Sequence, residues 1–570
     1  MNLYDKSSLI LVPGAVKDGK VYSQRPENGD GDFTFSRGSS ATRVDENGLI
    51  EKGRENFLLR SNQFDTTWYN TTSSETSGQI GYDGSNDAWE LSISAAAGRL
   101  TQLISLGGVQ TFSVYAKAGT YNFLNLYAIG NVAHAAYFDL SAGSVGTTFS
   151  LIDSSITSVG NGWYRCSITF SDTTLNVRFY PAVADNDLTG TSGSIYIQNA
   201  QLEAGLVATD YIESTTTTAV SGITEDLPRL DYSGGASCPS LKLEPQRTNL
   251  ITHSEYLGGA FSLDGTSLDY NYGVSPEGVS NSALLTQTGS VASNSIYNFG
   301  LPTTDGSYTY SFFFKAGTST KCRMYVGTGV AEDFNPQTIT AGYSGGTLNI
   351  LFEDYGDGWW RASATQTLSG AGTNRFSIYP DRSNQGRNVE IWGTRVESGS
   401  YPSSYIPTYG ASVTKLQDEC SVTGVSDLIG QTEGTIFVEA KIAGDDASNR
   451  RVINLSDGTT SNRIEVYAKV SSSQLELAIR DNGVDSVVLT SSSVGLDTTF
   501  KMAIAYASND CAYYVNGTLV GTDSSVVVPS TSKITFGRGD GNFLWQGEIN
   551  QALLFKTRLS NEELADLTTI

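Results

Sequence analysis

Residues 112–119 read Phe-Ser-Val-Tyr-Ala-Lys-Ala-Gly, and residues 310–317 repeat the pattern as Tyr-Ser-Phe-Phe-Phe-Lys-Ala-Gly. Further matched pairs follow the same order along the chain: NFLLRS at 56–61 with NLITHS at 249–254, GNGWYR at 160–165 with GDGWWR at 356–361, YP at 180–181 with 379–380, LEAG at 202–205 with VESG at 396–399, and YI at 211–212 with 405–406. This order predicts a duplicated domain. Such modularity favours binding or scaffolding over a single deep active site.

The composition predicts an all-β protein. The 570 residues include 60 Gly, 30 Tyr and 23 Phe, only 17% are charged, and aromatic and β-branched residues suit half-buried pleated surfaces. Runs such as 111–115 and 195–198 alternate between apolar and polar residues and are separated by Gly, Asn and Asp turns, as in sandwiches of antiparallel sheets. We therefore expect three antiparallel β-sandwich (jelly-roll) domains in tandem, the first two duplicated, plus an extended N-terminal segment.

The repeat boundaries divide the chain into segments. The Gly- and Asp-rich N-terminal segment is too short to bury a core of its own, so we expect it to pack against a partner or a later segment. Within it, Asn47-Gly48 between apolar pairs predicts a hairpin. The expected segments are 1–55 (N-terminal segment), 56–214 (repeat 1), 215–248 (connector), 249–409 (repeat 2), 410–419 (linker) and 420–570 (a different sandwich).

The last domain has its own strand and helix signals. Residues 435–442 place apolar side chains on one face, as a strand buried on one side requires. Asn516-Gly517 predicts a second tight hairpin. Ser560 and Glu563 form a capping-box pattern, which predicts one short terminal helix.

Charge and cysteine content exclude several classes of protein. The formal charge of −23 argues against nucleic-acid binding, which needs a basic surface. The first residues lack a leader's basic and apolar regions, and no apolar run is long enough for a transmembrane helix, so no membrane insertion is expected. The scattered cysteines suggest neither disulfides nor zinc and are interpreted as small buried hydrophobic residues of a protein made in a reducing cytosol: Cys166, Cys238, Cys322, Cys420 and Cys511.

Two strings resemble segments that recur in virion proteins of tailed bacteriophages: residues 33–51, beginning FTFSRGSSATRV, and residues 227–251, which include LPRLDYSGG and CPSLKLEPQRTN. In that family the two strings tend to lie close together. Repeat 1 therefore resembles an insertion, and we expect the two connecting segments to meet in space.

The domains carry resemblances of their own. The repeats, with their Lys-Ala-Gly, Gly-Trp and Glu-x-Gly landmarks, resemble carbohydrate-binding-module-like jelly rolls of phage fibres. Residues 515–521, 534–538, 545–550 and 559–564 resemble parts of a laminin G or concanavalin A-like sandwich.

These resemblances imply a structural virion protein, most simply a tail-fibre-like component that recognises host-surface glycans or proteins. Residues 1–55 would then bind other virion proteins, and a homotrimer is plausible. The protein would be made in the host cytoplasm and located in the virion. The alternative is a head fibre or capsid-decoration protein. A polysaccharide depolymerase is a third hypothesis, but the sequence shows neither the β-helix repeats nor the pair of carboxylates that such an enzyme would need.

No catalytic residues are predicted, and the chain is interpreted as not an enzyme. His253 lies where repeat 1 has Arg60, which favours a surface role over a catalytic triad, and the other histidine is His134. Trp163 and Trp359 occupy matched positions, which favours core packing, with the arginine two residues later closing each sandwich through hydrogen bonds.

Loop aromatic and polar residues of the last domain are the predicted ligand contacts, because binding residues concentrate on loops. For a glycan or protein ligand they are Trp545, Asn542, Asp540, Arg538 and Tyr513. No cofactor is required, although loop carboxylates could bind Ca²⁺, with Asp445, Asp446 and Asp540 as candidates. The Asn28-Gly-Asp30-Gly-Asp32 run lacks the glutamate and helices of an EF-hand and is interpreted as a polar turn.

Overall fold

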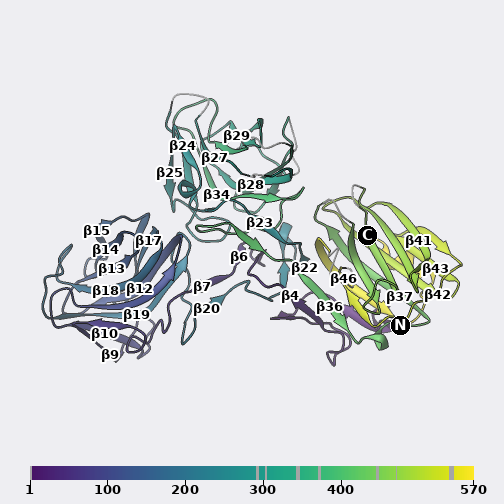
Figure 1. Ribbon diagram of the computed structural model, residues 1–570, viewed down its shortest axis with the longest axis horizontal. Coiled ribbons are helices and arrows are strands. Elements are labelled where there is room, and N and C mark those ends of the chain that lie inside the picture. Colours follow the sequence, from purple (N-terminus) through teal and green to yellow (C-terminus); the bar gives the residue numbers. More distant parts are fainter. Residues whose placement is uncertain are drawn as a thin grey trace.

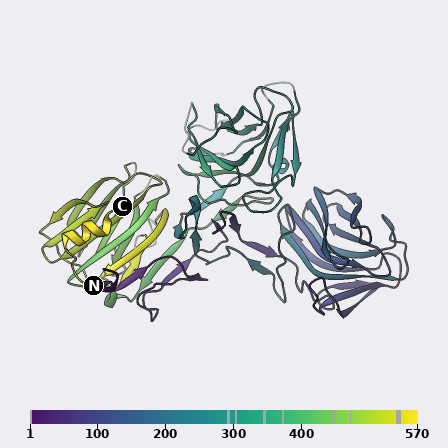
Figure 2. The same ribbon diagram turned by 180° about the vertical axis from the view of Figure 1, so that it is seen from behind.

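The computed structural model describes residues 3–289, 294–301, 304–341, 347–369, 374–444, 449–469, 472–537 and 545–570. The fold is all-β, as predicted, with antiparallel sheets throughout the described residues and two short helices, α1 (Leu3–Lys6) and α2 (Asn561–Thr568). Three sandwiches surround a central junction of connecting strands (Figures 1 and 2). Neither described helix is long and apolar enough to cross a membrane.

Repeat 1 consists of two six-stranded antiparallel sheets. The first has the order β16 (Asp153–Gly160), β17 (Trp163–Ser171), β12 (Val109–Ala118), β19 (Gly193–Ala204), β10 (Ala88–Ile93) and β9 (Ser73–Gln79). The second has the order β15 (Ser144–Phe149), β14 (Ala133–Asp139), β13 (Phe123–Ile129), β18 (Thr174–Ala182), β11 (Arg99–Leu106) and β8 (Tyr69–Thr71). Apolar side chains that alternate along both sheets fill one core between them, including Phe112, Val114, Leu126 and Phe179.

Repeat 2 has the same design. Its first sheet has the order β25 (Thr266–Tyr270), β26 (Ala283–Gln287), β34 (Asn388–Ser398), β28 (Gly306–Ala316), β32 (Trp359–Leu368) and β31 (Ile350–Asp354). Its second sheet has the order β24 (Ser262–Asp264), β27 (Ser295–Phe299), β33 (Arg375–Tyr379), β29 (Cys322–Val326) and β30 (Val330–Phe334). Lys117 lies opposite Trp163 in repeat 1, and Lys315 lies opposite Trp359 in repeat 2, so the duplicated sequence folds in matched register.

The third sandwich unites both ends of the chain. One sheet has the order β21 (Arg229–Asp231), β22 (Ser240–Leu243), β46 (Gly547–Phe555), β37 (Glu433–Ile442), β42 (Thr499–Ala507), β43 (Asp510–Val515) and β44 (Thr518–Asp523), with β1 (Leu9–Leu11) also paired to β46. The other has the order β2 (Val16–Lys17), β3 (Lys20–Val21), β4 (Phe33–Ser36), β36 (Glu419–Thr423), β45 (Lys533–Thr535), β38 (Arg450–Ser456), β39 (Arg463–Ala468), β40 (Gln474–Asp481) and β41 (Val484–Ser493).

The N-terminal segment packs against later segments, one of the two arrangements that we expected. Strand β4 pairs with β36, and β1 pairs with β46. Leu9, Leu11 and Phe33 are fully buried in the core of the third sandwich. Three- and four-residue strands cannot bury their apolar faces alone, and here a later segment completes that burial.

The two connecting segments meet in space, as expected. Strand β7 (Arg54–Asn56) pairs with β20 (Ala219–Ser221), and the backbone N–H of Val44 donates to Asp231 Oδ1 at 2.9 Å. In the smallest sheets, β5 (Thr42–Val44) pairs with β6 (Ile50–Lys52), and β23 (Arg247–Asn249) pairs with β35 (Val413–Lys415). The two ends of repeat 1 therefore lie side by side, as expected of a domain inserted between the two connecting segments.

Several local predictions are confirmed. The Asn47-Gly48 turn joins β5 to β6. Asn516 and Gly517, with φ of 49° and 73°, join β43 to β44 in the conformation that a two-residue hairpin requires. Ser560 and Glu563 form the capping box of α2. Four cysteines are buried as expected, but Cys238 is exposed, because it lies on the turn between β21 and β22.

Candidate functional site

The sequence landmarks shared by the repeats form a hydrogen-bonded cluster in each repeat. We call it the clasp, and it consists of Asn56, Glu203, Thr209 and Ile212 in repeat 1 and of Asn249, Glu397, Ser403 and Ile406 in repeat 2. Asn56 Nδ2 donates to Ile212 O at 2.8 Å, and Asn249 Nδ2 donates to Ile406 O at 2.9 Å. Each side-chain oxygen accepts from the N–H two residues later, at 3.2 and 3.1 Å. Both asparagines are fully buried. They tie the first segment of each repeat to its last, which explains why the NFLLRS and NLITHS strings recur with their distant Tyr-Ile partners.

A glutamate completes each clasp. Glu203 accepts from the backbone N–H of Thr209 at 2.9 Å and from its hydroxyl at 2.5 Å. Glu397 accepts from the N–H and hydroxyl of Ser403 at 3.0 and 2.8 Å. These carboxylates are buried and hydrogen-bonded, so the Glu-x-Gly landmark closes a loop and does not face a ligand.

The Trp-x-Arg landmarks are structural, as predicted, although neither tryptophan belongs to the core between its two sheets. Trp163 and Trp359 are 1% and 2% exposed. Arg165 donates to the carbonyl of Thr209, and Arg361 donates to the carbonyl of Ser403 at 2.9 Å. The arginines therefore fix the loop that follows the last strand of each repeat to its first sheet through hydrogen bonds.

The clasp yields a stability prediction. Asn249→Ala removes an amide whose Nδ2 donates to buried backbone carbonyls and whose Oδ1 accepts from a buried backbone N–H. The substitution should lower the free energy of unfolding by about 2–3 kcal/mol. Scanning calorimetry of the full chain would measure the loss. Asn384→Ala, at an exposed asparagine of the same repeat, is the control and should change stability by less than about 0.5 kcal/mol. A clasp variant as stable as the control would contradict this role.

The first sheet of each repeat faces the junction. Ile50 of the N-terminal segment packs with Phe313, Trp359, Trp392 and Tyr405 on the outer side of the first sheet of repeat 2. Figure 1 shows β28 and β34 nearer the junction than β29. That face is thus covered, and the outer face of the second sheet is turned away from the junction.

In repeat 1, the outer face of the second sheet carries tyrosine and arginine side chains, which we call aromatic face 1. The Tyr127 and Tyr180 ring centroids lie 5.8 Å apart, edge to face. The guanidinium of Arg178 lies 5.4 Å from the Tyr127 ring and donates to the Tyr180 hydroxyl at 3.1 Å. Arg99 lies 5.8 Å from the Tyr180 ring. Beside them, burial raises the pKa of Tyr137, and Asp185 reinforces the shift.

The corresponding surface of repeat 2, aromatic face 2, surrounds one arginine with rings. The Arg375 guanidinium lies 5.0 Å from Tyr297, 5.3 Å from Phe299, 5.3 Å from Tyr325 and 5.8 Å from Tyr379. Phe299 is 56% exposed. Tyr297, Tyr325 and Arg375 are half-buried, and Tyr379 is buried beneath them. Three rings and a cation therefore reach solvent, a combination suited to a ligand with apolar and polar faces.

The strand registers place the two faces in correspondence. Tyr127 lies opposite Arg178, and Tyr325 lies opposite Ser377. Tyr180 and Tyr379 occupy the next matched outward position. The arginine is shifted by two residues along the strand, since Arg375 precedes Ser377 where Arg178 stands in repeat 1. Two tyrosines and one arginine on the same sheet face therefore recur in both repeats.

Two of the five ligand contacts predicted in the third sandwich do not lie on its surface. Trp545 and Tyr513 are fully buried in its core, so neither side chain is available to a ligand, and this prediction is corrected. Tyr513 lies on β43, and Trp545 lies just before β46. Arg538, Asp540 and Asn542 lie outside the described residues, as do the calcium candidates Asp445 and Asp446.

The histidines have local partners. His134 is buried, with Nε2 3.1 Å from Asp172 Oδ2 and Nδ1 2.6 Å from Ser150 O. His253 is half-buried, its ring lies edge-on to Tyr256, and burial lowers its pKa.

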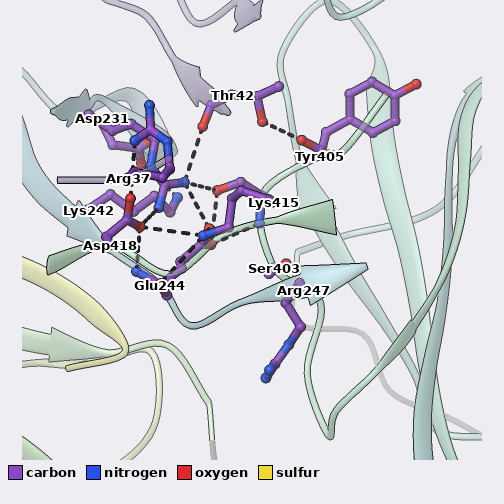
Figure 3. A network of polar contacts seen from close by, with 12 residues as sticks. Arg37, Thr42, Asp231, Lys242, Glu244, Arg247, Ser403, Tyr405, Lys415 and Asp418 are labelled. Atoms are coloured by element: carbon purple, nitrogen blue, oxygen red, sulfur yellow. Dashed lines mark hydrogen bonds and ion pairs between the residues drawn. The ribbon is translucent and has the colours of Figure 1, made fainter. Parts of the chain in front are cut away.

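A buried ion network fixes the junction (Figure 3). Arg229 Nη1 lies 2.8 Å from Glu244 Oε2, and its Nη2 pairs with Asp418. Arg37 of the N-terminal segment lies 3.1 Å from Asp418, and Lys415 lies 3.7 Å from Glu244. Burial would raise the pKa of Glu244, but Arg229 and Lys415 hold it well below its usual value. Burial lowers the pKa of Lys415 to about 8.

A second buried cluster joins the junction to the repeats. Lys52 Nζ lies 3.0 Å from Glu255 and 2.8 Å from Glu277, both of repeat 2. Gly108 of repeat 1 approaches Tyr409 so closely that a Cβ would lie 1.7 Å from its carbonyl oxygen. The repeats are therefore held at a defined mutual orientation.

The sequence of the third sandwich matches a known family. Residues 417–565 match the family model of the concanavalin A-like lectin/glucanases superfamily. This part of the chain is a concanavalin A-like domain. The domain incorporates N-terminal strands that lie outside the matched residues, β1 and β4 among them.

Solved structures resemble parts of the chain. The CBM40 module of the Ruminococcus gnavus IT-sialidase, bound to α2,3-sialyllactose, is 16% identical over 25% of this chain and 84% of that chain, with a TM-score of 0.22. A leech intramolecular trans-sialidase is 18% identical over 25% and 24%, with a TM-score of 0.22. A pentraxin from Limulus polyphemus is 14% identical over 23% and 68%, with a TM-score of 0.20. Likenesses this low carry no conclusion about a ligand or reaction. No curated protein matches the chain.

The aromatic faces were not predicted from the sequence. Tyr180-Pro181 and Tyr379-Pro380 served only as repeat markers. The signal was the alternation in β13 and β29, where Asn125 and Tyr127, or Arg323 and Tyr325, point away from a core of apolar neighbours.

Proposed function

We propose that this protein is a glycan-recognising adhesin that binds through aromatic faces 1 and 2 and catalyses no reaction. The main observation in support is that two tyrosines and an arginine recur on the outward face of the second sheet in both repeats. Sugar rings present apolar faces that pack on aromatic side chains, and their hydroxyls suit neighbouring polar groups.

We place this adhesin in the virion of a tailed phage, as a tail-fibre-like component assembled after synthesis in the host cytoplasm. The resemblance of residues 33–51 and 227–251 to virion-protein segments supports this origin. Two recognition faces on one chain, multiplied by several copies on a particle, would convert weak individual binding into strong adhesion.

Glycan-array binding of the full-length protein tests the proposal. Phe299→Ala and Tyr325→Ala should each weaken binding about tenfold, because each removes one ring of aromatic face 2 and about 1.4 kcal/mol of contact. Leu519→Ala is the matched control, since this leucine is 46% exposed on β44 of the other sandwich. A protein that binds no glycan, or ring variants that bind as tightly as the control, would refute the proposed site.

A further inference from the structure

Arg375 is held in place from within the sheet. Its Nε donates to the Ser377 hydroxyl, and its Nη2 donates to the Ser295 hydroxyl at 3.2 Å. Both serines are fully buried. These bonds fix the plane of the guanidinium, and the structure gives Nη1 no acceptor within the described residues.

Arg375 also forms no ion pair with any carboxylate that the structure describes. Elsewhere in the same repeat, Arg323 pairs with Asp333, and Arg395 pairs with Glu397. The chain has 59 acidic residues and 36 basic ones, so carboxylates outnumber the cations that they can neutralise. Arg375 is thus an oriented, half-buried guanidinium without a carboxylate partner among the described residues.

The acidic groups near this face do not satisfy Arg375. Asp333 is occupied by Arg323 and by Lys321, whose Nζ lies 3.5 Å away. Asp264 lies opposite Ser295 in the strand register, and no ion pair connects it to Arg375. The positive charge at the centre of the rings thus stays available to an incoming anion.

We propose that aromatic face 2 recognises a carboxylate-bearing sugar, such as a uronic acid or a sialic acid, with Arg375 as the partner of the sugar carboxylate. The inference rests on the proposed glycan-binding function and names its ligand class. An arginine suits this role because its planar donors match the two carboxylate oxygens. The four rings line the guanidinium, and a sugar bound over them would exclude water from it, which would strengthen a charge-assisted hydrogen bond.

The experiment compares acidic and neutralised sugars on the full-length protein. Oligogalacturonate, oligomeric alginate, hyaluronan oligosaccharides and sialyllactose would be titrated by calorimetry beside their carboxyl-reduced forms. At least one acidic sugar should bind about tenfold or more tightly than its reduced form, with the preference weakening as salt rises. R375Q should abolish that preference, and R375K should weaken it.

Arg387→Gln is the control, because this arginine of the same repeat lies outside the face and donates to the carbonyl of Thr318. It should keep the preference. Melting curves of each variant would verify folding, and R375K serves if R375Q does not fold. Equal binding of acidic and reduced sugars, or an R375Q protein that keeps the preference, would overturn the inference while leaving glycan binding intact. An array that shows no glycan bound would overturn both.

Discussion

Arg229→Met should lower the free energy of unfolding by about 3–5 kcal/mol, because removing one partner of a buried ion network leaves the others without compensation. The side chains of Arg229, Glu244 and Asp418 are 0%, 2% and 0% exposed. Methionine fills much of the volume but donates nothing, so two carboxylates would lose their main partner. Denaturant unfolding of the full chain would measure the change.

The control for this substitution is Arg558→Met. Arg558 pairs with Asp510 at 3.0 Å, but that aspartate is 51% exposed. Exposed pairs contribute about 0–1 kcal/mol, so this variant should be nearly as stable as the parent. If Arg229→Met and Arg558→Met lose equally little, the junction network does not stabilise the fold.

The same substitution tests how the sandwiches are coupled. The Arg229 network draws on the N-terminal segment, the connector and the linker, through Arg37, Glu244 and Lys415. We expect the loss of this network to weaken the contacts at the junction more than it destabilises any one sandwich. Since each sandwich keeps its own core, we expect the variant's calorimetric transition to broaden into separate steps.

The fold class could be predicted because its signals are local. The alternation in residues 111–115 and the Asn-Gly turns each depend on neighbouring residues, and the repeat doubled the evidence. The strands with which residues 1–55 pair could not be predicted in the same way. Strand β1 pairs with β46, and Leu9 faces Leu554, a contact between chain ends that no local pattern encodes.

The site was predicted less well for a related reason. Sequence identifies an aromatic residue but not the sheet face on which it lies, which depends on register. Trp545, beside turn-forming residues, had the sequence features of an exposed contact, yet it is buried. Tyr325 looked like an ordinary strand residue, yet it belongs to aromatic face 2. The distinction appears only when the strands pair.

Trp545→Ala should therefore cost stability without removing a ligand contact. The Trp545 ring is fully buried, and its centroid lies 6.3 Å from that of Phe500, edge to face. Truncating a buried tryptophan to alanine leaves a large cavity and should lower the free energy of unfolding by about 3–5 kcal/mol. Denaturant titration would measure the loss, and glycan binding below the melting temperature should persist through the repeats.

Trp545→Phe is the matched control for that substitution. The Trp545 Nε1 has no acceptor in the part of the chain that the structure describes, so phenylalanine sacrifices no hydrogen bond there. It keeps most of the apolar contact and should cost less than about 2 kcal/mol. A Trp545→Ala protein of unchanged stability that no longer binds glycans would place this ring at a ligand surface. Loss of stability graded from phenylalanine to alanine, with binding retained, would assign it to the core of the concanavalin A-like domain.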